Sequence, residues 1–340
     1  MGERIRLGVI GIGLAWDKLH WPALKQLGGK YEVAAVCNRT LSKAEAFAET
    51  ISLPKERVYD DYRRMIERDD LDAVDVLVPI SENFEVARDV LNTGRHLIAE
   101  KPFASTAEGV KELIALKNQK NLIVMVAENI LYDQETLIIK ELLTSGELGE
   151  AVSFTHTTGA DFDKGAAGSV FFTTKWRQHP SFEGGSFIDG GVHDIAQMRF
   201  LFGDVESLYA DGRPHEKDYC PYDTIAALLR FKSGVIGQFT YCSARAERTS
   251  PPMGLRIACT KGDIYLESKY YGNVRITRDD GSVEERPFTP SRGYLGEMLN
   301  FWDAVKNGGA ITATPEAELG DIELIYDILR SARGKRPVIK

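Results

Sequence analysis

Two short stretches of this 340-residue chain carry side chains that could do acid–base chemistry. Lys101 stands between Glu100 and Pro102, and Asp189 and His193 stand four residues apart in a glycine-rich stretch. An imidazole, with an ordinary pKa of about 6.5, can accept a proton from a hydroxyl group near neutral pH. A lysine ammonium can stabilise negative charge developing on the same oxygen. This set predicts oxidation of an alcohol or its reversal, with Asp189 orienting the imidazole or binding a substrate hydroxyl.

Such a reaction needs an acceptor for the hydride, and the start of the chain predicts a binding site for one. Gly11 and Gly13 follow directly after the apolar run 5–10, as in the glycine turn that binds the pyrophosphate of a dinucleotide. The third glycine of that pattern is replaced by Trp16. The indole could join the core of the domain or face the cofactor. If residues 14–20 are irregular, Pro22 would lie near the start of the regular helix.

The residues after the second apolar run favour NADP(H). A site for NAD(H) usually has an acidic residue here, which binds the ribose 2′-hydroxyl, whereas this chain has Asn38 and Arg39. The arginine can bind a 2′-phosphate, the asparagine can bind the ribose, and Lys43 could add a second cation. The alternative is that Arg39 is an exposed turn residue. The sequence predicts NADP(H) as the preferred cofactor and leaves NAD(H) open.

The first 125 residues alternate short apolar runs with amphipathic helical stretches, which predicts a parallel sheet covered by helices. Motifs of the form Ser-x-x-Glu at Ser42–Glu45 and Ser105–Glu108 predict helix starts. The expected strands are 5–11, 31–38, 72–79, 95–102 and 121–129, and a further helix is expected at 84–94. We therefore expect an N-terminal α/β Rossmann domain over residues 1–125.

After about residue 130 the pattern changes to runs of period two, which predict hairpins. The expected strands are 151–160, 206–213, 224–244, 255–268 and 273–288, and the expected helices are 135–149, 294–308 and 315–334. Residues 126–340 should form an α+β substrate-binding and oligomerisation domain with a large, open, mostly antiparallel sheet. The uncovered face of such a sheet predicts a homodimer or homotetramer.

The stretches AEKPFAS (Ala99–Ser105), KWR (Lys175–Arg177) and GGSFIDGGVHDI (Gly184–Ile195) resemble the glucose–fructose oxidoreductase / inositol dehydrogenase (Gfo/Idh/MocA) family. The resemblance covers essentially the whole chain. It implies NAD(P)-dependent hydride transfer between the nicotinamide and a hydroxyl or carbonyl carbon of a carbohydrate, polyol or cyclitol. It assigns the catalytic roles by position to Lys101, Asp189 and His193.

The resemblance also places Trp176 and Arg177 near the substrate, where an arginine could bind a carboxylate or several hydroxyls. The expected cofactor-binding residues are Gly11, Gly13, Leu14, Ala15, Trp16, Asn38, Arg39, Lys43, Pro79, Glu100 and Lys101. The expected substrate-binding residues are Lys101, Asn129, Trp176, Arg177, Asp189, His193 and Tyr294. We expect the glycine-rich segment 159–185 to shape specificity. The chain departs from the family at 81–84, near which the family often has a histidine.

Composition and charge argue against several other classes of function. A net charge of −8 argues against nucleic acid as a partner, and the apolar runs are shorter than a membrane span. The four cysteines form no Cys-x-x-Cys pair, which is typical of a reducing cytoplasm, and the histidines show no metal-ligand spacing, so no metal is expected. Two other functions stay open: a redox-assisted glycosidase with tightly bound nucleotide, and a non-enzymatic nucleotide-binding regulator.

Overall fold

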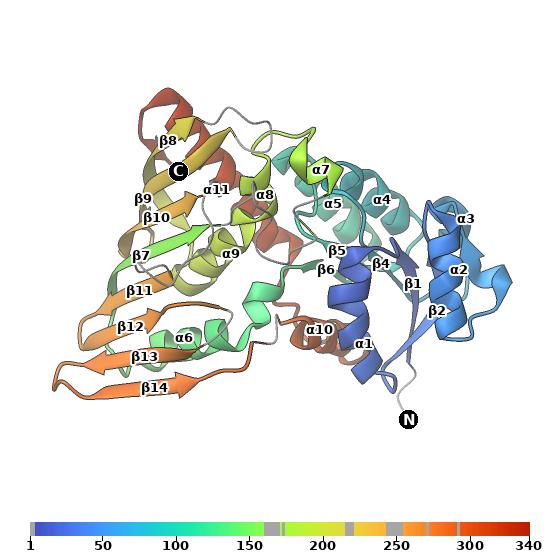
Figure 1. Cartoon of the computed structure of the whole chain (residues 1–340), viewed down its shortest axis with the longest axis horizontal. Coiled ribbons are helices and arrows are strands. Elements are labelled where there is room, and N and C mark those ends of the chain that lie inside the picture. The colour runs from blue at the N-terminus through green and yellow to red at the C-terminus, as the bar shows by residue number, and fades with distance from the viewer. Residues whose placement is uncertain are drawn as a thin grey trace. The chain divides into compact units, whose positions relative to one another are not determined.

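The computed structural model describes residues 4–159, 171, 174–214, 221–242, 254–269, 272–290 and 293–340. The chain forms two compact units (Figure 1). Unit 1 comprises Met1–Asn129 and Tyr294–Leu319, and unit 2 comprises Ile130–Gly293 and Gly320–Lys340. Unit 1 therefore combines the N-terminal part of the chain with one segment from near its C-terminus.

Unit 1 contains a six-stranded parallel sheet with the order β3-β2-β1-β4-β5-β6, which confirms the expected Rossmann architecture. The strands are β1 (Ile5–Ile10), β2 (Tyr31–Cys37), β3 (Val58–Tyr59), β4 (Ala73–Val76), β5 (His96–Glu100) and β6 (Val124–Ala127). The strand order reverses between β1 and β4. Open α/β sheets bind their ligands outside the carboxyl ends of the strands at such a reversal.

The helices of unit 1 bury apolar side chains in its core, except the short turn Lys55–Arg57. They are η1 (Trp16–His20), α1 (Trp21–Gln26), α2 (Leu41–Thr50), η2 (Lys55–Arg57), α3 (Tyr62–Ile66), α4 (Ile80–Asn92), α5 (Ala107–Lys120) and α10 (Tyr294–Asn307). Val86 and Val90 of α4 pack with Leu113 of α5 in one core cluster. Met298 and Phe301 of α10 are also completely buried, so α10 completes the hydrophobic core of this unit.

Three helix starts differ from the sequence-based expectation. Helix α2 begins at Leu41 after Thr40, so Ser42 lies inside its first turn and does not cap it. Helix α5 begins at Ala107, where the hydroxyl of Thr106 accepts from the backbone N–H of Gly109 at 3.1 Å. The cap is therefore a threonine adjacent to the expected serine in the second case. Helix α4 starts directly after Pro79, four residues earlier than expected.

Unit 2 contains a nine-stranded sheet with the order β14-β13-β12-β11-β7-β10-β9-β8-β15 (Figure 1), as the hairpin pattern predicts. Among the described strands of this nine-stranded sheet, only β7 and β10 pair in parallel. The strands are β7 (Ala151–Gly159), β8 (Val205–Pro214), β9 (Tyr222–Phe231), β10 (Ile236–Cys242), β11 (Gly254–Cys259), β12 (Gly262–Leu266), β13 (Asn273–Arg278), β14 (Val283–Pro287) and β15 (Val338–Ile339).

Helices cover one face of this sheet (Figure 1). They are α6 (Gln134–Ser145), α8 (Ser186–Asp189), α9 (Gly191–Phe202) and the unit 2 part of α11 (Pro315–Gly334). The short helix α7 (Lys175–Gln178) buries no residue, and η3 (Asn129–Tyr132) precedes α6. The buried face carries aromatic rings, with Phe154 stacked on Phe202 at 5.0 Å between centroids. The other face exposes Tyr209, Leu228 and Ile236, so it presents apolar side chains to solvent.

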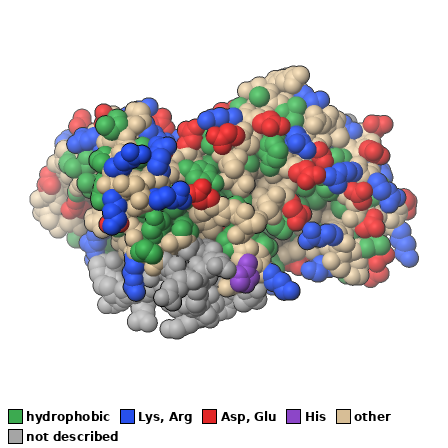
Figure 2. Space-filling model, turned by 90° about the horizontal axis from the view of Figure 1, so that it is seen from above, with side chains coloured by type: hydrophobic (Ala, Val, Ile, Leu, Met, Phe, Trp, Pro, Cys, Tyr) green, Lys and Arg blue, Asp and Glu red, His purple; other side chains and the backbone are tan. Residues whose placement is uncertain are grey.

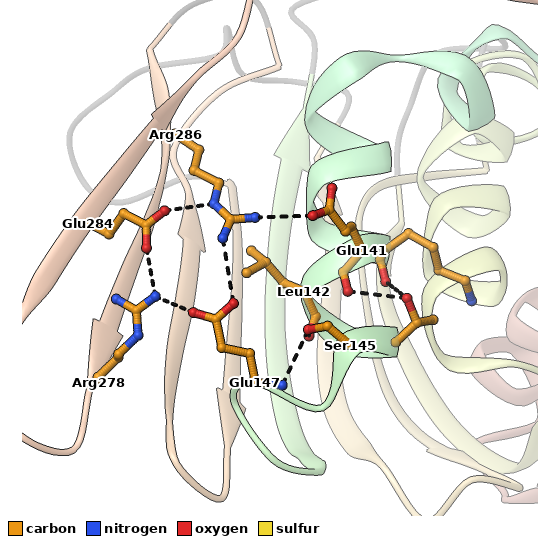
Figure 3. A network of polar contacts seen from close by, with 9 residues as sticks. Glu141, Leu142, Ser145, Glu147, Arg278, Glu284 and Arg286 are labelled. Carbon is orange, nitrogen blue, oxygen red and sulfur yellow. Dashed lines mark hydrogen bonds and ion pairs between the residues drawn. The ribbon is translucent and has the colours of Figure 1, made fainter.

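Strand β14 forms one edge of the sheet, and its charged side chains join a network of ion pairs (Figure 3). Glu284 contacts Arg278 of β13 at 2.6 Å and Arg286 of β14 at 2.7 Å. Arg286 also contacts Glu141 of α6 and Glu147 at 3.7 and 3.6 Å, and Arg278 pairs with Glu147. Charges on an exposed edge strand disfavour pairing with a further strand.

On the face seen in Figure 2, acidic and basic side chains of the described residues are interspersed. In the part of the chain that the structure describes, no helix combines the length and apolar composition needed to cross a membrane.

Candidate active site

The turn after β1 has the backbone shape of a dinucleotide-binding turn. Gly11 has φ +104°, and a Cβ there would lie 2.1 Å from the carbonyl oxygen of Leu77, so this position requires glycine. A Cβ on Gly13 would meet no atom within 4 Å. The backbone at Gly13 is therefore open to close approach by a pyrophosphate, and the helix through Leu14 and Ala15 begins at once. The turn fits the expected cofactor.

Trp16 lies in the core of unit 1 and has no exposed surface. Its ring stacks on Trp21 at 5.6 Å between centroids and contacts the edge of Phe47 at 5.1 Å. Residues 16–20 form a π-helical turn, in which Trp21 N–H donates to the carbonyl oxygen of Trp16, and Pro22 lies in the first turn of α1. The structure thus places the indole in the core of unit 1, with no exposed side-chain surface.

The residues after β2 remain accessible. Arg39 is 83% exposed, and its Nη1 lies 3.2 Å from Oε1 of Glu82. Asn38 donates to the carbonyl oxygen of Thr40 at 3.0 Å, and Lys43 is exposed. An ion pair this exposed contributes only about 0–1 kcal/mol. The guanidinium of Arg39 can therefore leave Glu82 for a more highly charged phosphate.

The backbone of the segment after β5 is hydrogen-bonded to a side chain that we did not expect in the site. Asn83, in the first turn of α4, is 1% exposed, and its amide donates to the carbonyl oxygens of Glu100 at 3.1 Å and Pro102 at 2.7 Å. The Lys101–Pro102 peptide bond is cis. In the sequence, the departure from the family pattern at 81–84 was the one indication that this position is special. Pro79, the residue before α4, ends the neighbouring β4 segment.

His20 is a second buried residue that sequence reasoning did not place in the site. Its Nδ1 lies 2.8 Å from Oδ2 of Asp75, and its Nε2 lies 3.3 Å from Oε1 of Glu100. Burial alone would lower the pKa of His20, but the charges of Asp75 and Glu100 outweigh burial and raise it well above its ordinary value. The sequence could have indicated the burial of His20, because this histidine lies within the apolar stripe that contains Trp16 and Leu19.

Helix α10 adds a buried acid to this region. Glu297 is completely buried, and neither of its carboxylate oxygens has a hydrogen-bond partner. Burial raises the pKa of Glu297 well above its ordinary value; His20 opposes this, and Glu100, Glu128 and Asp75 add to it. An unpaired carboxyl in such a place is held neutral.

The second group of expected residues lies in unit 2. Arg177 of α7 donates from Nε to Oδ2 of Asp189 at 2.6 Å, and its guanidinium carbon lies 4.0 Å from the ring centroid of Trp176. Asp189 ends α8, and His193 lies half-buried in the first turn of α9. Asp189 is thus oriented by an arginine. Part of the expected specificity segment, residues 160–170, 172 and 173, lies outside the described residues.

The expected residues therefore form two groups. In unit 1, the glycine turn, Asn38, Arg39, Pro79, Glu100 and Lys101 follow the carboxyl ends of β1, β2, β4 and β5, which share one edge of the parallel sheet. Asn129 follows β6 and is 9% exposed. Tyr294 begins α10 with its ring centroid 5.8 Å from that of His20. No cluster of three or more metal-ligating side chains occurs among the residues that the structure describes.

A parallel dinucleotide-binding unit combined with a unit built on a large, mostly antiparallel sheet defines an NAD(P)-dependent oxidoreductase. Residues 5–128 match the family model described as "Oxidoreductase family, NAD-binding Rossmann fold", and residues 136–265 match the "GFO/IDH/MocA C-terminal domain". The chain belongs to the Gfo/Idh/MocA family.

Relatives and solved structures agree with this assignment. An uncharacterized protein of Saccharomyces cerevisiae is 29% identical over 99% of this chain and 98% of its own length. A dTDP-3,4-didehydro-2,6-dideoxy-alpha-D-glucose 3-reductase of Saccharopolyspora spinosa is 31% identical over 71% of this chain and 69% of its own length. D-xylose 1-dehydrogenase (NADP(+)) 2 of Haloferax volcanii is 27% identical over 96% of each. An oxidoreductase structure from Thermotoga maritima has a TM-score of 0.86, 29% identity, and coverage of 99% and 98%.

Proposed function

We propose that the protein is an NADP(H)-preferring dehydrogenase or reductase acting on a hydroxyl or carbonyl carbon of a carbohydrate, polyol or cyclitol. The observation that carries the cofactor preference is Arg39, which is 83% exposed directly after β2 and is followed by a second exposed cation, Lys43. The reductase of S. spinosa and the xylose dehydrogenase of H. volcanii support the substrate class.

The proposed roles follow from the chemistry of each side chain. The nicotinamide, when bound, accepts or supplies a hydride at C4. His193 accepts the hydroxyl proton during oxidation and returns it during reduction. Lys101 stabilises negative charge on the substrate oxygen. Asp189, ion-paired with Arg177, binds a substrate hydroxyl or orients the imidazole.

Fluorescence titration with NADPH and NADH tests the cofactor assignment. We expect NADPH to bind at least about tenfold more tightly, since one phosphate–arginine contact contributes about 1.5–3 kcal/mol. Arg39→Ala should remove most of the difference, and Arg64→Ala, which removes another exposed arginine of unit 1, should not. Equal affinities for both nucleotides would overturn the preference, and failure to bind either would overturn the whole proposal.

A panel of sugars, polyols, cyclitols and their keto forms, followed by NADPH absorbance, tests the reaction. Lys101→Ala and His193→Ala should each reduce turnover by at least about a hundredfold, whereas Lys55→Ala, at an exposed lysine outside the expected site, should not. Cleavage of a glycoside without net NADPH consumption would instead support the redox-assisted glycosidase. Full activity in both variants would contradict the assigned roles.

We also propose that the protein is a homodimer or homotetramer. The uncovered face of the nine-stranded sheet exposes Tyr209 at 40%, Leu228 at 61% and Ile236 at 41%, and apolar side chains on such a face are typical of an interface. Sedimentation velocity should show an oligomer, and Leu228→Lys should shift it toward monomer. A monomeric wild type would overturn this part of the proposal.

A further inference from the structure

One buried group of charged side chains in unit 1 has no role in the reaction as proposed above. His20 lies between Asp75 of β4 and Glu100 of β5, and both His20 and Asp75 are completely buried. Glu100 is the residue before Lys101, and its side chain retains 14% exposure. The three residues therefore connect the interior of the unit to the sheet edge that carries the proposed cofactor site.

The geometry around the imidazole defines its charge. Asp75 is hydrogen-bonded to Nδ1 at 2.8 Å. Nε2 lies 3.3 Å from a carboxylate oxygen of Glu100, an ion-pair distance. A neutral imidazole has one N–H, so its lone pair would face one of the two carboxyl groups, which is repulsive when that group is ionised. Only the imidazolium form of His20 can donate to the carboxyl groups on both sides, which agrees with the raised pKa of His20.

The position of His20 in the chain links two parts of the site. The π-helical turn Trp16–His20 follows directly after the glycine turn, and π-helical turns occur frequently at functional sites. Its first residue packs on Phe47 and its last reaches Asp75 and Glu100. The turn thus connects the pyrophosphate-binding backbone to the end of β5.

We propose that His20 is a positioning residue that fixes the Glu100 carboxylate at the end of β5 and couples it to the glycine turn. This inference rests on the proposed function, because Lys101, the residue after Glu100, takes its role in the reaction there, and Glu100 is among the expected cofactor-binding residues. Removing His20 would leave two buried or half-buried carboxylates facing each other, and an uncompensated buried charge moves or takes up a proton. Either change would displace the segment that contains Lys101.

A substitution at Asp75 tests the role of the charge on His20 without removing its imidazole. The titratable groups around His20 come from five elements or segments and are Tyr31, Asp75, Glu100, Glu128, Tyr294 and Glu297. Asp75 is the largest of the influences that raise the pKa of His20. In Asp75→Asn, burial then lowers that pKa, so that His20 loses its proton as the pH rises and no longer holds Glu100.

The experiment measures the NADPH dissociation constant by fluorescence from pH 7 to 8.5, above the pKa of about 6 at which a phosphate monoester changes charge. The wild type should be nearly independent of pH in this window. His20→Asn should bind about tenfold more weakly at every pH, the effect of losing one charged contact. Asp75→Asn should bind progressively more weakly as the pH rises, and adding Glu100→Gln should abolish that dependence. His96→Asn is the matched control, since His96 is a half-buried histidine at the opposite end of β5, and it should leave affinity unchanged.

Nitrogen NMR of ¹⁵N-histidine-labelled wild type gives a readout independent of binding, and should show His20 as an imidazolium at pH 7.5. A neutral ring, or wild-type affinity in folded His20→Asn, would overturn the inference while leaving the proposed function intact. If His20→Asn does not fold, a flat pH profile in Asp75→Asn overturns it. If wild type binds neither NADPH nor NADH, the proposed function and this inference both fail.

Discussion

The side-chain amide of Asn83 lies 2.7 Å from the carbonyl oxygen of Pro102 and donates a hydrogen bond to it. The second hydrogen of the same amide reaches the carbonyl oxygen of Glu100 at 3.1 Å. A carboxamide has two donors on one nitrogen, so one side chain holds the backbone on both sides of Lys101. The first turn of α4 thereby sets the conformation of the segment in which Lys101 lies.

Asn83→Ala should destabilise the protein, because it leaves two carbonyl oxygens without their donor. The expected loss is about 1–3 kcal/mol in the free energy of unfolding, measured by urea denaturation. Asn92→Ala, at an exposed position of the same helix, should change stability by less than about 0.5 kcal/mol. Equal effects of the two substitutions would show that the amide of Asn83 does not support this segment.

Glu82→Gln should strengthen NADPH binding, because it removes the carboxylate that competes with the 2′-phosphate for Arg39. We expect a gain of about two- to fivefold, matching an exposed ion pair of at most about 1 kcal/mol. NADH affinity should stay constant. Glu85→Gln, which removes another exposed acid of α4, provides the comparison. An equal gain for NADH would mean that Glu82 acts by general charge and not through Arg39.

Glu297→Gln should alter the dependence of stability on pH. The folded-state pKa of Glu297 is raised above its ordinary value of 4.5, so its contribution is fully present below about that pH and is lost as the pH rises toward the folded pKa. The slope for one such group is about 1.4 kcal/mol per pH unit. Between pH 5.5 and 8, wild type should therefore lose stability relative to Glu297→Gln in thermal melts. Glu108→Gln, at an exposed acid, should run parallel to wild type.

Trp16→Ala should destabilise the protein by about 3–5 kcal/mol, since it empties a site packed between Trp21 and Phe47. Asp17→Ala, at the next and exposed position, should have little effect. In the milder Trp16→Phe variant, NADPH affinity should stay within about twofold of wild type. A large loss of NADPH affinity in that folded variant would indicate that the indole contacts the cofactor.

The parallel sheet of unit 1 and the hairpins of unit 2 could be predicted from the sequence because hydrophobic period and turn residues are local signals. Strands β3 and β15 have only two residues each, too few for any period to show. The start of α5 was misplaced by one residue because Ser105 and Thr106 are both acceptable caps. Local sequence patterns therefore predict whether an element is a helix or a strand better than they predict the residues at which it begins and ends.

The candidate site was predictable to the extent that glycines and charged residues follow apolar runs. Arg39 and Lys101 could be found this way, since strand ends in a parallel sheet meet at one edge. His20 and Asn83 could not. Their partners are distant in sequence, since Asp75 lies 55 positions after His20 and Pro102 lies 19 positions after Asn83. The type of a buried polar residue does not indicate which backbone group or carboxylate it will contact.

Helix α10 has a consequence for how the protein is made. The hydrophobic core of unit 1 needs Met298 and Phe301, and Val126 N–H donates to the carbonyl oxygen of Ala313. These residues are synthesised after all of the large segment Ile130–Gly293. At about 5–20 residues per second, translation of that segment takes roughly 10–30 s. During this interval the nascent nucleotide-binding unit exposes the apolar surface that α10 later covers, so a chaperone that binds unfinished chains has its target there, and a gene fragment ending at residue 129 should yield insoluble protein.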